Sequence, residues 1–371
     1  MALIKYVVFH PWKAGTILVV GVLLGLFSFY AYQVNTAFAV VATEEFHPEA
    51  ARVAIEAAPP AQAPAVDLEY DEPKFDVNED PLELVKERLG SAIDPRTVHP
   101  TSFSDPIDDE VFDAYLLVGT DASGFLADSI ILGLQPTEGG TEASAPIMVS
   151  LPRDLWVWNI CKGAFSRLNV GLGGCKGSAS GAELLALMVE DYTGIPIDHL
   201  AKISFTGFSG LVNVMGGISV CVNYPTRDAK AHLDIPAGCQ RLNGEQALAW
   251  VRSRHTEQLK GGEWVQVAGS DFARQKRQQD VLFQLAGSAA RVSSPAALTE
   301  ALRYVANSVR LDSGWSLSQA ISTGWKYRGI SKDSVSRFTI EADGFRTSGG
   351  KAVLIPTSSF DEQLATVYTL P

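Results

Sequence analysis

Apolar runs separated by glycine, proline and polar positions divide the chain beyond about residue 108 into short predicted elements. Six runs are typical of strands: residues 115–118, 129–134, 146–151, 199–204, 218–222 and 351–356. The first three are largely apolar, which indicates buried strands.

Helix signals fall between these runs. Ser180 and Glu183 form a predicted capping box before an apolar stretch that ends at Gly194. A second box at residues 243–246 begins a helix that runs to about Arg252. Further helices are expected at residues 208–215, 271–290 and 296–307. Strands that alternate with helices predict a layered α/β fold around a largely buried sheet.

The N-terminal part has a different pattern. Residues 14–33 are apolar and uncharged, and are long enough to span a bilayer as a helix. Cations precede this run and acidic residues follow it: Lys5, His10 and Lys13, then Glu44, Glu45 and Glu49. The positive-inside rule therefore predicts that residues 1–13 are cytoplasmic and that the rest lies outside the cell membrane. A cleavable signal peptide cut near residues 36–39 is the alternative, although the run exceeds a usual signal core.

Residues 34–107 are expected to form an extracytoplasmic tether. Residues 51–76 are rich in Ala, Pro, Glu and Asp, and Pro59, Pro60 and Pro64 interrupt any helix there. A short helix is predicted at residues 81–89, with Pro81 at its first position. The main domain then occupies residues 108–371.

Composition narrows the function. The formal net charge is −12, and the isoelectric point is near 5.0. Binding to nucleic acid by charge needs a basic surface, so we expect no nucleic-acid partner. Hydrophobic residues make up 46% of the chain, enough for a sizeable core.

Four cysteines fit an exported domain. Their spacing matches neither a zinc knuckle nor a thioredoxin-like redox pair. Three disulfide connectivities are possible, and pairing within the sequence closes the shortest loops. We therefore expect Cys161 to pair with Cys175 and Cys221 with Cys239.

Arginines concentrate in two segments of this acidic chain, residues 251–254 and 271–279. Asp271 is a predicted helix N-cap, which would put Arg274 in the first turn, where the helix dipole disfavours a cation unless an anion lies between them. A phosphate or pyrophosphate would satisfy both. The alternatives are helix-end capping by Arg252 and Arg254 and a solvated helix face.

Two carboxylates lie near the ends of predicted strands. Asp121 follows the first strand and Asp128 precedes the second, and together they could bind Mg²⁺. Turn capping is the simpler role for either. Arg153 and Asp154 follow the third strand at the same expected edge, where a salt bridge or cap is again the alternative. Bidentate arginines beside a metal are suited to phosphoryl transfer.

In these residues the chain resembles the LytR-CpsA-Psr family of cell-wall ligases, high-GC Gram-positive type. The matching segments follow one another in order: LVGTD (117–121), DSIIL (128–132), SLPRD (150–154), RLN (167–169), TGIPIDH (193–199), MGGI (215–218), LNGEQAL (242–248), VRSR (251–254) and DFARQKRQQ (271–279). The resemblance implies a three-layer α/β/α domain with a mixed central sheet and a C-terminal extension, displayed outside one transmembrane helix. It also implies a phosphotransferase that moves a phospho-linked glycopolymer from a polyprenyl-pyrophosphate lipid to peptidoglycan or a related wall polymer.

Carried over by position, the resemblance assigns roles to individual residues. Asp121 and Asp128 resemble the Mg²⁺ ligands. The expected pyrophosphate clamp is Arg153, Arg252, Arg254 and Arg274. Substrate-binding residues nearby are Asn169, Gln275, Arg277 and Gln278. Asp154 and Asp271 are candidate bases, and residues 184–189 and 205–214 are candidates to line a lipid groove.

The chain departs from the family in one place. Arginines that the family carries after the first aspartate and before the second are replaced by Ala122-Ser123 and Leu126-Ala127. Either pyrophosphate binding is weaker, or His255 or Lys260 compensates. The alternatives to a ligase are therefore a non-catalytic or regulatory lipid-binding protein of the envelope, sometimes labelled a transcriptional attenuator, and a pyrophosphate hydrolase.

Overall fold

The computed structural model describes most of the main domain and a short N-terminal part. The described ranges are residues 42–58, 106–121, 123–138, 141–142, 145–267, 270–290, 308–316, 330–347 and 350–370, with single positions at 32, 35, 36, 104, 304, 319, 322, 323, 326 and 327. The predicted transmembrane helix, most of the tether and the predicted helices at 81–89 and 296–307 lie outside the described residues. Within the ranges described, no helix is both long and apolar enough to cross a membrane.

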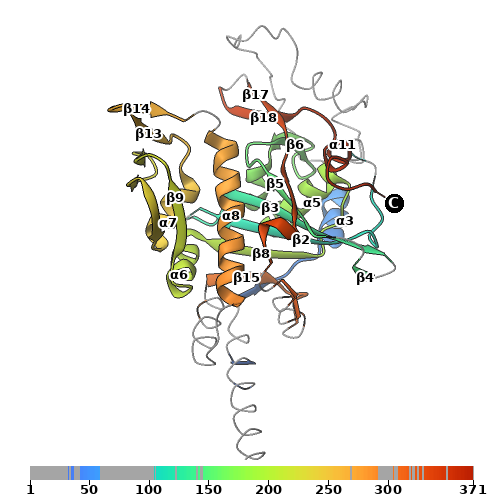
Figure 1. The fold of residues 1–371 in the computed structure, drawn as a ribbon. Helices are drawn as coiled ribbons and strands as arrows, with labels where there is room; N and C mark the ends of the chain where they lie inside the picture. The colour runs from blue at the N-terminus through green and yellow to red at the C-terminus, as the bar shows by residue number, and fades with distance from the viewer. Residues whose placement is uncertain are drawn as a thin grey trace, which may run out of the picture.

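An eight-stranded mixed sheet forms the centre of the domain (Figure 1). Its strand order is β1 (Ala42–Glu44), β15 (Val309–Asp312), β8 (His199–Ser204), β2 (Phe112–Thr120), β3 (Ala127–Glu138), β5 (Ile147–Leu151) and β16 (Ser336–Thr339), with β4 (Thr141–Glu142) paired to β3. The pair β2–β8 is parallel, whereas β2–β3 and β3–β5 are antiparallel. The expected α/β fold with a mixed central sheet is confirmed.

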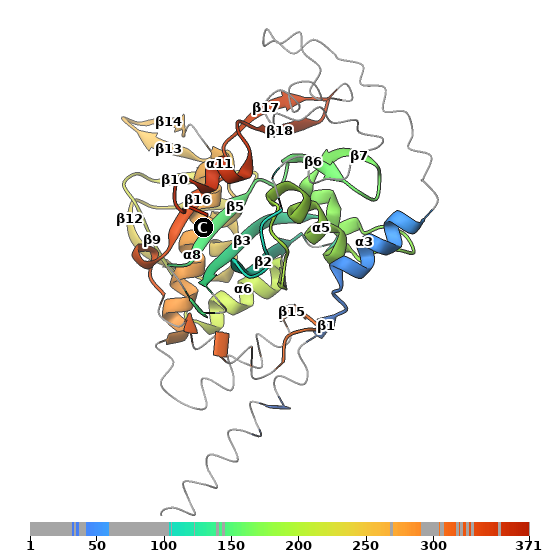
Figure 2. The same ribbon diagram turned by 90° about the vertical axis from the view of Figure 1, so that its right-hand side faces the viewer.

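Helices cover both faces of this sheet (Figures 1 and 2). One face carries α5 (Gly181–Thr193), α3 (Pro48–Ala57) and the 3₁₀ helix η2 (Leu168–Gly173). The other carries α6 (Phe205–Val214) and α8 (Ser270–Ala290), with α7 (Gly244–Arg252) packed against both. Leu116 and Leu132 are fully buried toward α5, and side chains alternate along a strand, so Leu117 and Ile131 face the α6–α8 side.

A smaller β substructure extends from α7. It contains the hairpin of β9 (Ile218–Val222) and β12 (Gly238–Leu242), and a second sheet of β10 (Thr226–Asp228), β11 (Leu233–Ile235), β13 (Glu257–Lys260) and β14 (Glu263–Gln266). A separate apolar core, which includes Val212, Ile218 and Val281, joins it to α6, α7 and α8. The β13–β14 hairpin was not predicted and occupies the loop between two arginine segments.

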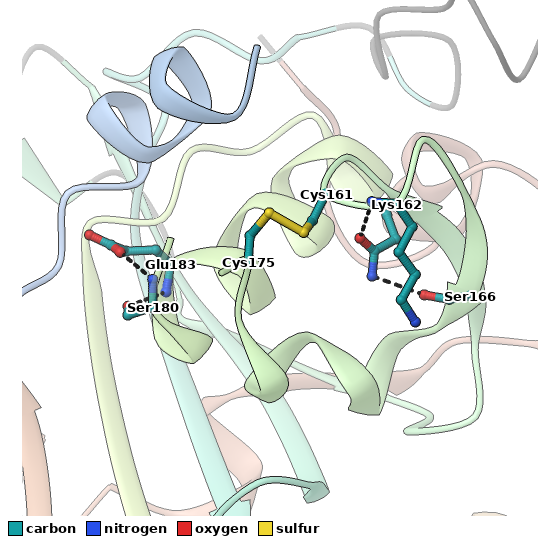
Figure 3. Close-up of a disulfide and its surroundings, with 7 residues drawn as sticks. Cys161, Lys162, Ser166, Cys175, Ser180 and Glu183 are labelled. Atoms are coloured by element: carbon teal, nitrogen blue, oxygen red, sulfur yellow. Dashed lines mark hydrogen bonds between the residues drawn. A yellow bond between two sulfur atoms is a disulfide. The ribbon is translucent and has the colours of Figure 1, made fainter. Parts of the chain in front are cut away.

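Both predicted disulfides are present. Cys221 and Cys239 are cross-strand partners in the β9–β12 hairpin. Cys161 and Cys175 join the turn between β6 (Trp156–Asn159) and β7 (Ala164–Arg167) to the segment before α5 (Figure 3). The same view shows the capping box that begins α5.

Helix caps agree with the sequence except at α8. Ser180 and Glu183 form the α5 capping box, and Gly194 ends this helix in the left-handed conformation with φ 71°. Asn243 caps α7 through a second box. Helix α8 begins at Ser270, so Asp271 lies inside its first turn and the predicted N-cap is wrong. Two neighbouring cap-forming residues, Ser270 and Asp271, leave the boundary undetermined by sequence alone.

The start of the predicted tether belongs to the folded domain. Strand β1 pairs in parallel with β15, and Phe46 and Ala51 are buried. Arg52 on α3 forms an ion pair of 2.8 Å with buried Asp191 on α5. These residues were assigned to the tether because their surroundings are rich in Ala and Pro, whereas their contacts are made with distant parts of the chain.

The C-terminal segment is also integral to the domain. After the 3₁₀ helix η3 (Lys332–Ser334), strand β16 extends the sheet beside β5. A hairpin of β17 (Ala342–Arg346) and β18 (Ala352–Pro356) follows, and then α11 (Phe360–Leu364). Phe360 is fully buried and packs edge-on against Tyr192.

Candidate functional site

A cavity of about 390 Å³ lies between the sheet and helices α6, α7 and α8. Its polar lining residues are Asp128, Ser129, Arg153, Lys202, Ser204, Arg252, Arg254, Arg274 and Gln278. Its apolar lining includes Leu117, Ile131, Ala201, Ile203, Phe205, Phe208, Leu248, Val251, Leu282 and Val309. The cavity therefore combines a cationic part with an apolar part.

The strand register arranges the floor of this cavity. Leu117 pairs with Ile131 on one side and with Ala201 on the other, so the three form one apolar row. The next row toward the end of β2 contains Gly119 and Ser129. Residues two apart on a strand lie about 7 Å apart on one face. The apolar row therefore lies directly behind the row that carries Ser129.

A β-bulge brings Asp128 to the cavity. Gly119 pairs with Ser129 and Thr120 pairs with Ala127, which leaves Asp128 as the extra residue of β3. A bulge breaks the alternation of side chains and can re-aim one of them. Asp128 and Ser129 consequently both line the cavity although they are neighbours in sequence. Asp128 also forms an ion pair with the guanidinium of Arg153.

Asp154 connects several arginines. Its carboxylate lies 3.5 Å from Arg153 Nε, 3.2 Å from Arg167 Nη1 and 3.9 Å from Arg254 Nη2. It does not itself line the cavity. These contacts fix the guanidiniums of Arg153 and Arg254 relative to one another at the cavity wall. Asp154 therefore orients the arginines.

A buried carboxylate shapes the turn that carries Arg252 and Arg254. Asp228 is 1% exposed and accepts hydrogen bonds from the backbone N–H groups of Arg254 (2.9 Å) and His255 (2.7 Å) and from the Ser253 hydroxyl (2.8 Å). Burial raises the pKa of Asp228, but these hydrogen bonds outweigh it and hold the pKa below its usual range. The guanidinium carbon of Arg252 lies 4.3 Å from the centre of the Phe205 ring.

Helix α8 supplies the remaining polar wall. Arg274 is 4% exposed and lines the cavity. Gln278, one turn later on the same face, accepts a hydrogen bond from the Ser129 hydroxyl at 3.1 Å and donates one to the carbonyl of Val251 at 3.2 Å. These bonds hold α8 against both β3 and α7.

Four predicted site residues lie away from the cavity. Arg277 donates to the carbonyl oxygens of Trp250 and Ser253, and so caps the end of α7. Gln275 is buried at 3% exposure and does not line the cavity. The other two are Asn169 and Asp121. Asn169 is buried in η2, where its backbone N–H donates to Arg153.

Asp121 lies in the β2–β3 turn. Its carboxylate accepts hydrogen bonds from the Ser123 hydroxyl at 2.7 Å and the Gly124 N–H at 2.9 Å. The Ser123 bond is the main reason that the pKa of Asp121 is below its usual value. The carboxylate is therefore ionised at neutral pH and caps the turn, as the simpler sequence interpretation had it.

Of the other candidates, the side chain of Asp271 lies outside the described residues. His255 contacts Lys230, and the Lys260 ammonium lies 5.1 Å from the Tyr224 ring centre, so neither replaces the absent arginines in the cavity. Residues 184–189 of α5 are buried in the core on the opposite face of the sheet. Phe205 and Phe208, from the second predicted groove segment, do line the cavity.

Two carboxylates near the β2–β3 turn are candidate metal ligands. Asp128 faces the cavity, and ionised Asp121 lies on the same hairpin. In the part of the chain that the structure describes, no group of three or more His, Cys, Asp or Glu could hold a metal. Mg²⁺ commonly takes one or two carboxylates and fills its shell with water and substrate phosphate oxygens. Asp128 supplies one such carboxylate at the cavity, whereas the Asp121 carboxylate is hydrogen-bonded within its turn.

Several lining residues were not singled out from sequence. Ser129 shares a face with Ile131 through the period of two along β3, and this alternation was the available signal. Ser204, Leu248 and Leu282 line the cavity from three separate elements. Their convergence depends on tertiary packing, which local patterns do not specify.

The comparison with family models identifies the class of protein to which this fold and site belong. The LytR_cpsA_psr family model matches residues 114–367. The chain belongs to this family, as its sequence segments suggested.

Named relatives make the comparison more specific. The chain is 34% identical over 155 residues to the "Probable cell wall biosynthesis protein LcpB" of Corynebacterium glutamicum. The aligned region covers 38% of this chain and 36% of that protein. It is 26% identical over 228 residues to a Bacillus licheniformis protein named "Polyisoprenyl-teichoic acid--peptidoglycan teichoic acid transferase TagU". This alignment covers 60% of this chain and 65% of that protein. The solved "LytR-Csp2A-Psr enzyme from Actinomyces oris" matches with a TM-score of 0.55 and 25% identity, over 70% of this chain and 94% of that one.

Proposed function

We propose that this chain transfers a glycopolymer, as its phosphate ester, from a polyprenyl-pyrophosphate carrier to a cell-wall acceptor such as peptidoglycan. The observation that carries the proposal is the cavity in which Arg153, Arg252, Arg254 and Arg274 adjoin an apolar floor. A lipid pyrophosphate has the same two parts, an anion and an apolar chain. The names of the relatives support transfer to the wall.

In this reaction a hydroxyl of the acceptor attacks the phosphorus that bears the glycan. A new P–O bond forms, the P–O–P bridge breaks, and polyprenyl phosphate leaves with the bridging oxygen. The hydroxyl proton passes to a base at the cavity mouth. The guanidiniums offset the charge that gathers on the leaving phosphate, and Asp154 and Asp228 keep those guanidiniums oriented.

We propose that Mg²⁺ assists. Bound at Asp128, with water and phosphate oxygens completing its shell, it would supply charge neutralisation at the pyrophosphate. Asp128 is paired with Arg153, so metal binding and arginine position are coupled. We propose that the apolar floor and the lipid chain bound on it limit the access of water to the reacting phosphorus, which would favour a sugar hydroxyl over hydrolysis.

We further propose that the domain works outside the membrane, held there by a helix at residues 14–33. Two disulfides in the folded domain support this location, because disulfides persist in oxidising compartments. The acidic net charge supports a role other than nucleic-acid binding.

The proposal is tested by incubating the purified full chain with a polyprenyl-pyrophosphate glycan, peptidoglycan and Mg²⁺. We expect polyprenyl phosphate to appear together with glycan bound covalently to peptidoglycan, and chelation by EDTA to lower the rate. Release without attachment would identify a hydrolase. Tight lipid binding without release would identify a binding protein, and either result would contradict the ligase.

A further inference from the structure

The tip of the β2–β3 hairpin carries two neighbouring exposed apolar side chains. Phe125 is 68% exposed and Leu126 is 42% exposed. Among the described residues, they are the exposed large apolar residues that adjoin one another in sequence. Single exposed apolar residues are ordinary, but an adjacent pair at the tip of a hairpin forms a contiguous apolar patch, and such patches mark contact surfaces.

The turn holds this pair in a fixed presentation. The Asp121 carboxylate accepts hydrogen bonds from Ser123 and Gly124, and the Asp121 N–H donates to the Leu126 carbonyl at 3.1 Å. The polar groups of the turn are thus satisfied internally while the apolar side chains face outward. A preorganised turn loses little conformational entropy when it binds.

The tip adjoins the mouth of the cavity. Leu126 precedes Asp128 by two residues, and Asp128 lines the cavity with Arg153, Arg252 and Arg254. A bilayer with anionic headgroups complements this combination, because its surface attracts cations and its interface accepts apolar and aromatic side chains.

The register of β1 gives an independent indication of orientation. Ala42 pairs with Arg310, Arg310 with Lys202, and Lys202 with Val118. Strand β1 is parallel to β15, β15 is antiparallel to β8, and β8 is parallel to β2. Strand β1 therefore runs opposite to β2 and begins at the end of the sheet where β2 finishes. The chain therefore enters the sheet from the hairpin edge.

The expected membrane anchor, residues 14–33, precedes this entry point. Eight residues separate it from Ala42, and eight extended residues span at most about 28 Å. The hairpin edge is therefore the part of the sheet closest to the anchor along the chain. The opposite edge, where β2 begins, would lie farther from the bilayer.

We propose that Phe125 and Leu126 insert into the surface of the bilayer and hold the cavity mouth against the membrane that contains the polyprenyl donor. This inference rests on the proposed function and on the proposed anchor. This turn lacks the arginines that the family carries there, and in this proposal its apolar side chains bind the membrane instead. The donor then moves from the membrane into the cavity without crossing open water.

The contact can be measured with a single label. All four cysteines form disulfides, so Phe125→Cys introduces one free thiol for an environment-sensitive nitrobenzoxadiazole dye. In the full chain reconstituted into nanodiscs of phosphatidylcholine and phosphatidylglycerol, we expect a blue-shifted emission that headgroup-level spin-labelled lipids quench. Val265→Cys, at a 45% exposed position on β14, is the matched control and should remain unquenched.

Two labelling results would overturn the proposal. One is equal quenching, or none, at both positions. The other is shielding of position 125 that appears only when a nanodisc contains two copies of the chain, since this would assign the contact to a second copy. Both readouts are independent of catalysis.

A functional test separates this inference from the proposed function. The double variant Phe125→Ser/Leu126→Ser should transfer about tenfold less glycan from a bilayer-embedded donor, in line with the loss of one buried aromatic contact. Transfer from a short-chain, water-soluble donor should be unchanged. Equal loss with both donors would overturn the membrane contact, whereas failure of the wild type with both donors would refute the ligase and leave the labelling result to decide the insertion.

Discussion

At the scale of single residues, the cavity is cationic because its arginines outnumber its carboxylates. Arg153, Arg252, Arg254 and Arg274 line it, while Asp128 is the acidic lining residue in the described ranges. Asp154 balances part of that charge from behind the wall. The remaining positive charge suits a ligand with more than one negative charge, as a pyrophosphate has.

Arg252→Ala should lower kcat/KM for transfer by about 10²–10³-fold, the usual effect of removing one preorganised group that stabilises developing charge. Arg252 is exposed and contacts the Phe205 ring rather than a buried acid, so thermal unfolding should be nearly unchanged. Lys276→Ala, an exposed cation on α8 away from the cavity, is the matched control. Wild-type turnover in Arg252→Ala would refute the clamp.

Asp154→Asn tests whether this carboxylate orients the arginines or acts as the base. Because it contacts three guanidiniums, we expect kcat to fall about tenfold or more while the pH of half-maximal rate stays the same. Rates are compared across pH in the wild type and the variant. Loss of the acidic limb of the pH profile would instead identify Asp154 as the base.

The sequence predicted the arginines that line the cavity, but it also assigned to the site several nearby residues that lie outside it. Helical spacing explains the result on α8, since Arg274 and Gln278 are four residues apart and share a face. Gln275 is turned by about 100° from Arg274 and is buried elsewhere. Arg277 caps α7. Asp121 was assigned to metal by resemblance, but its hydrogen bonds within the turn could be seen only in the folded structure.

At the scale of secondary-structure elements, the strands were the most predictable part of the fold. Strands β8 and β9 have the boundaries expected from their apolar runs, and both capping boxes form. Strand β1 and helix α3 were missed because β1 pairs with β15, more than 260 residues away in sequence. Local patterns contain no information about such a partner.

Ala201→Phe should block the apolar floor. Ala201 lies in the row between Leu117 and Leu311 and lines the cavity, so a larger side chain fills space that the lipid chain would occupy. Binding of polyprenyl pyrophosphate, measured by calorimetry, should weaken by at least about tenfold. Binding of inorganic pyrophosphate should persist, and an unchanged lipid affinity would contradict the assignment of the floor.

The contact between α3 and α5 should depend on pH. Burial raises the pKa of Glu190 to about 6 and that of Asp191 to about 7, and the charge of Arg52 offsets only part of this effect. Both values exceed those of an unfolded chain. The stability that these groups contribute is therefore fully present below about pH 4 and is lost as pH rises through 6–7.

Asp191→Asn isolates this effect because its side chain cannot ionise. Between pH 5 and pH 8, the free energy of unfolding should fall more in the wild type than in the variant, by an amount on the order of 1 kcal/mol. Denaturant unfolding at both pH values gives the difference. A wild type that instead gains stability relative to the variant as pH rises would show that the Arg52 ion pair outweighs burial.

At the scale of the whole molecule, the cavity, the hairpin tip and the start of β1 share one edge of the central sheet. The resemblance to the family predicted the layered fold, and the match of the family model to residues 114–367 supports this prediction. It did not indicate that residues 42–57 pack onto the domain or that β13 and β14 form a hairpin beside the arginines. Both features depend on long-range pairing.

The central claim is that one cavity binds both the pyrophosphate and the chain of a lipid donor. A crystal structure of the protein with a bound polyprenyl pyrophosphate tests it most directly. We predict that the phosphate oxygens contact Arg153, Arg252, Arg254 and Arg274, and that the first isoprene units lie between the Leu117 row and Phe208. A pyrophosphate bound elsewhere, or a lipid chain outside this cavity, would contradict the account.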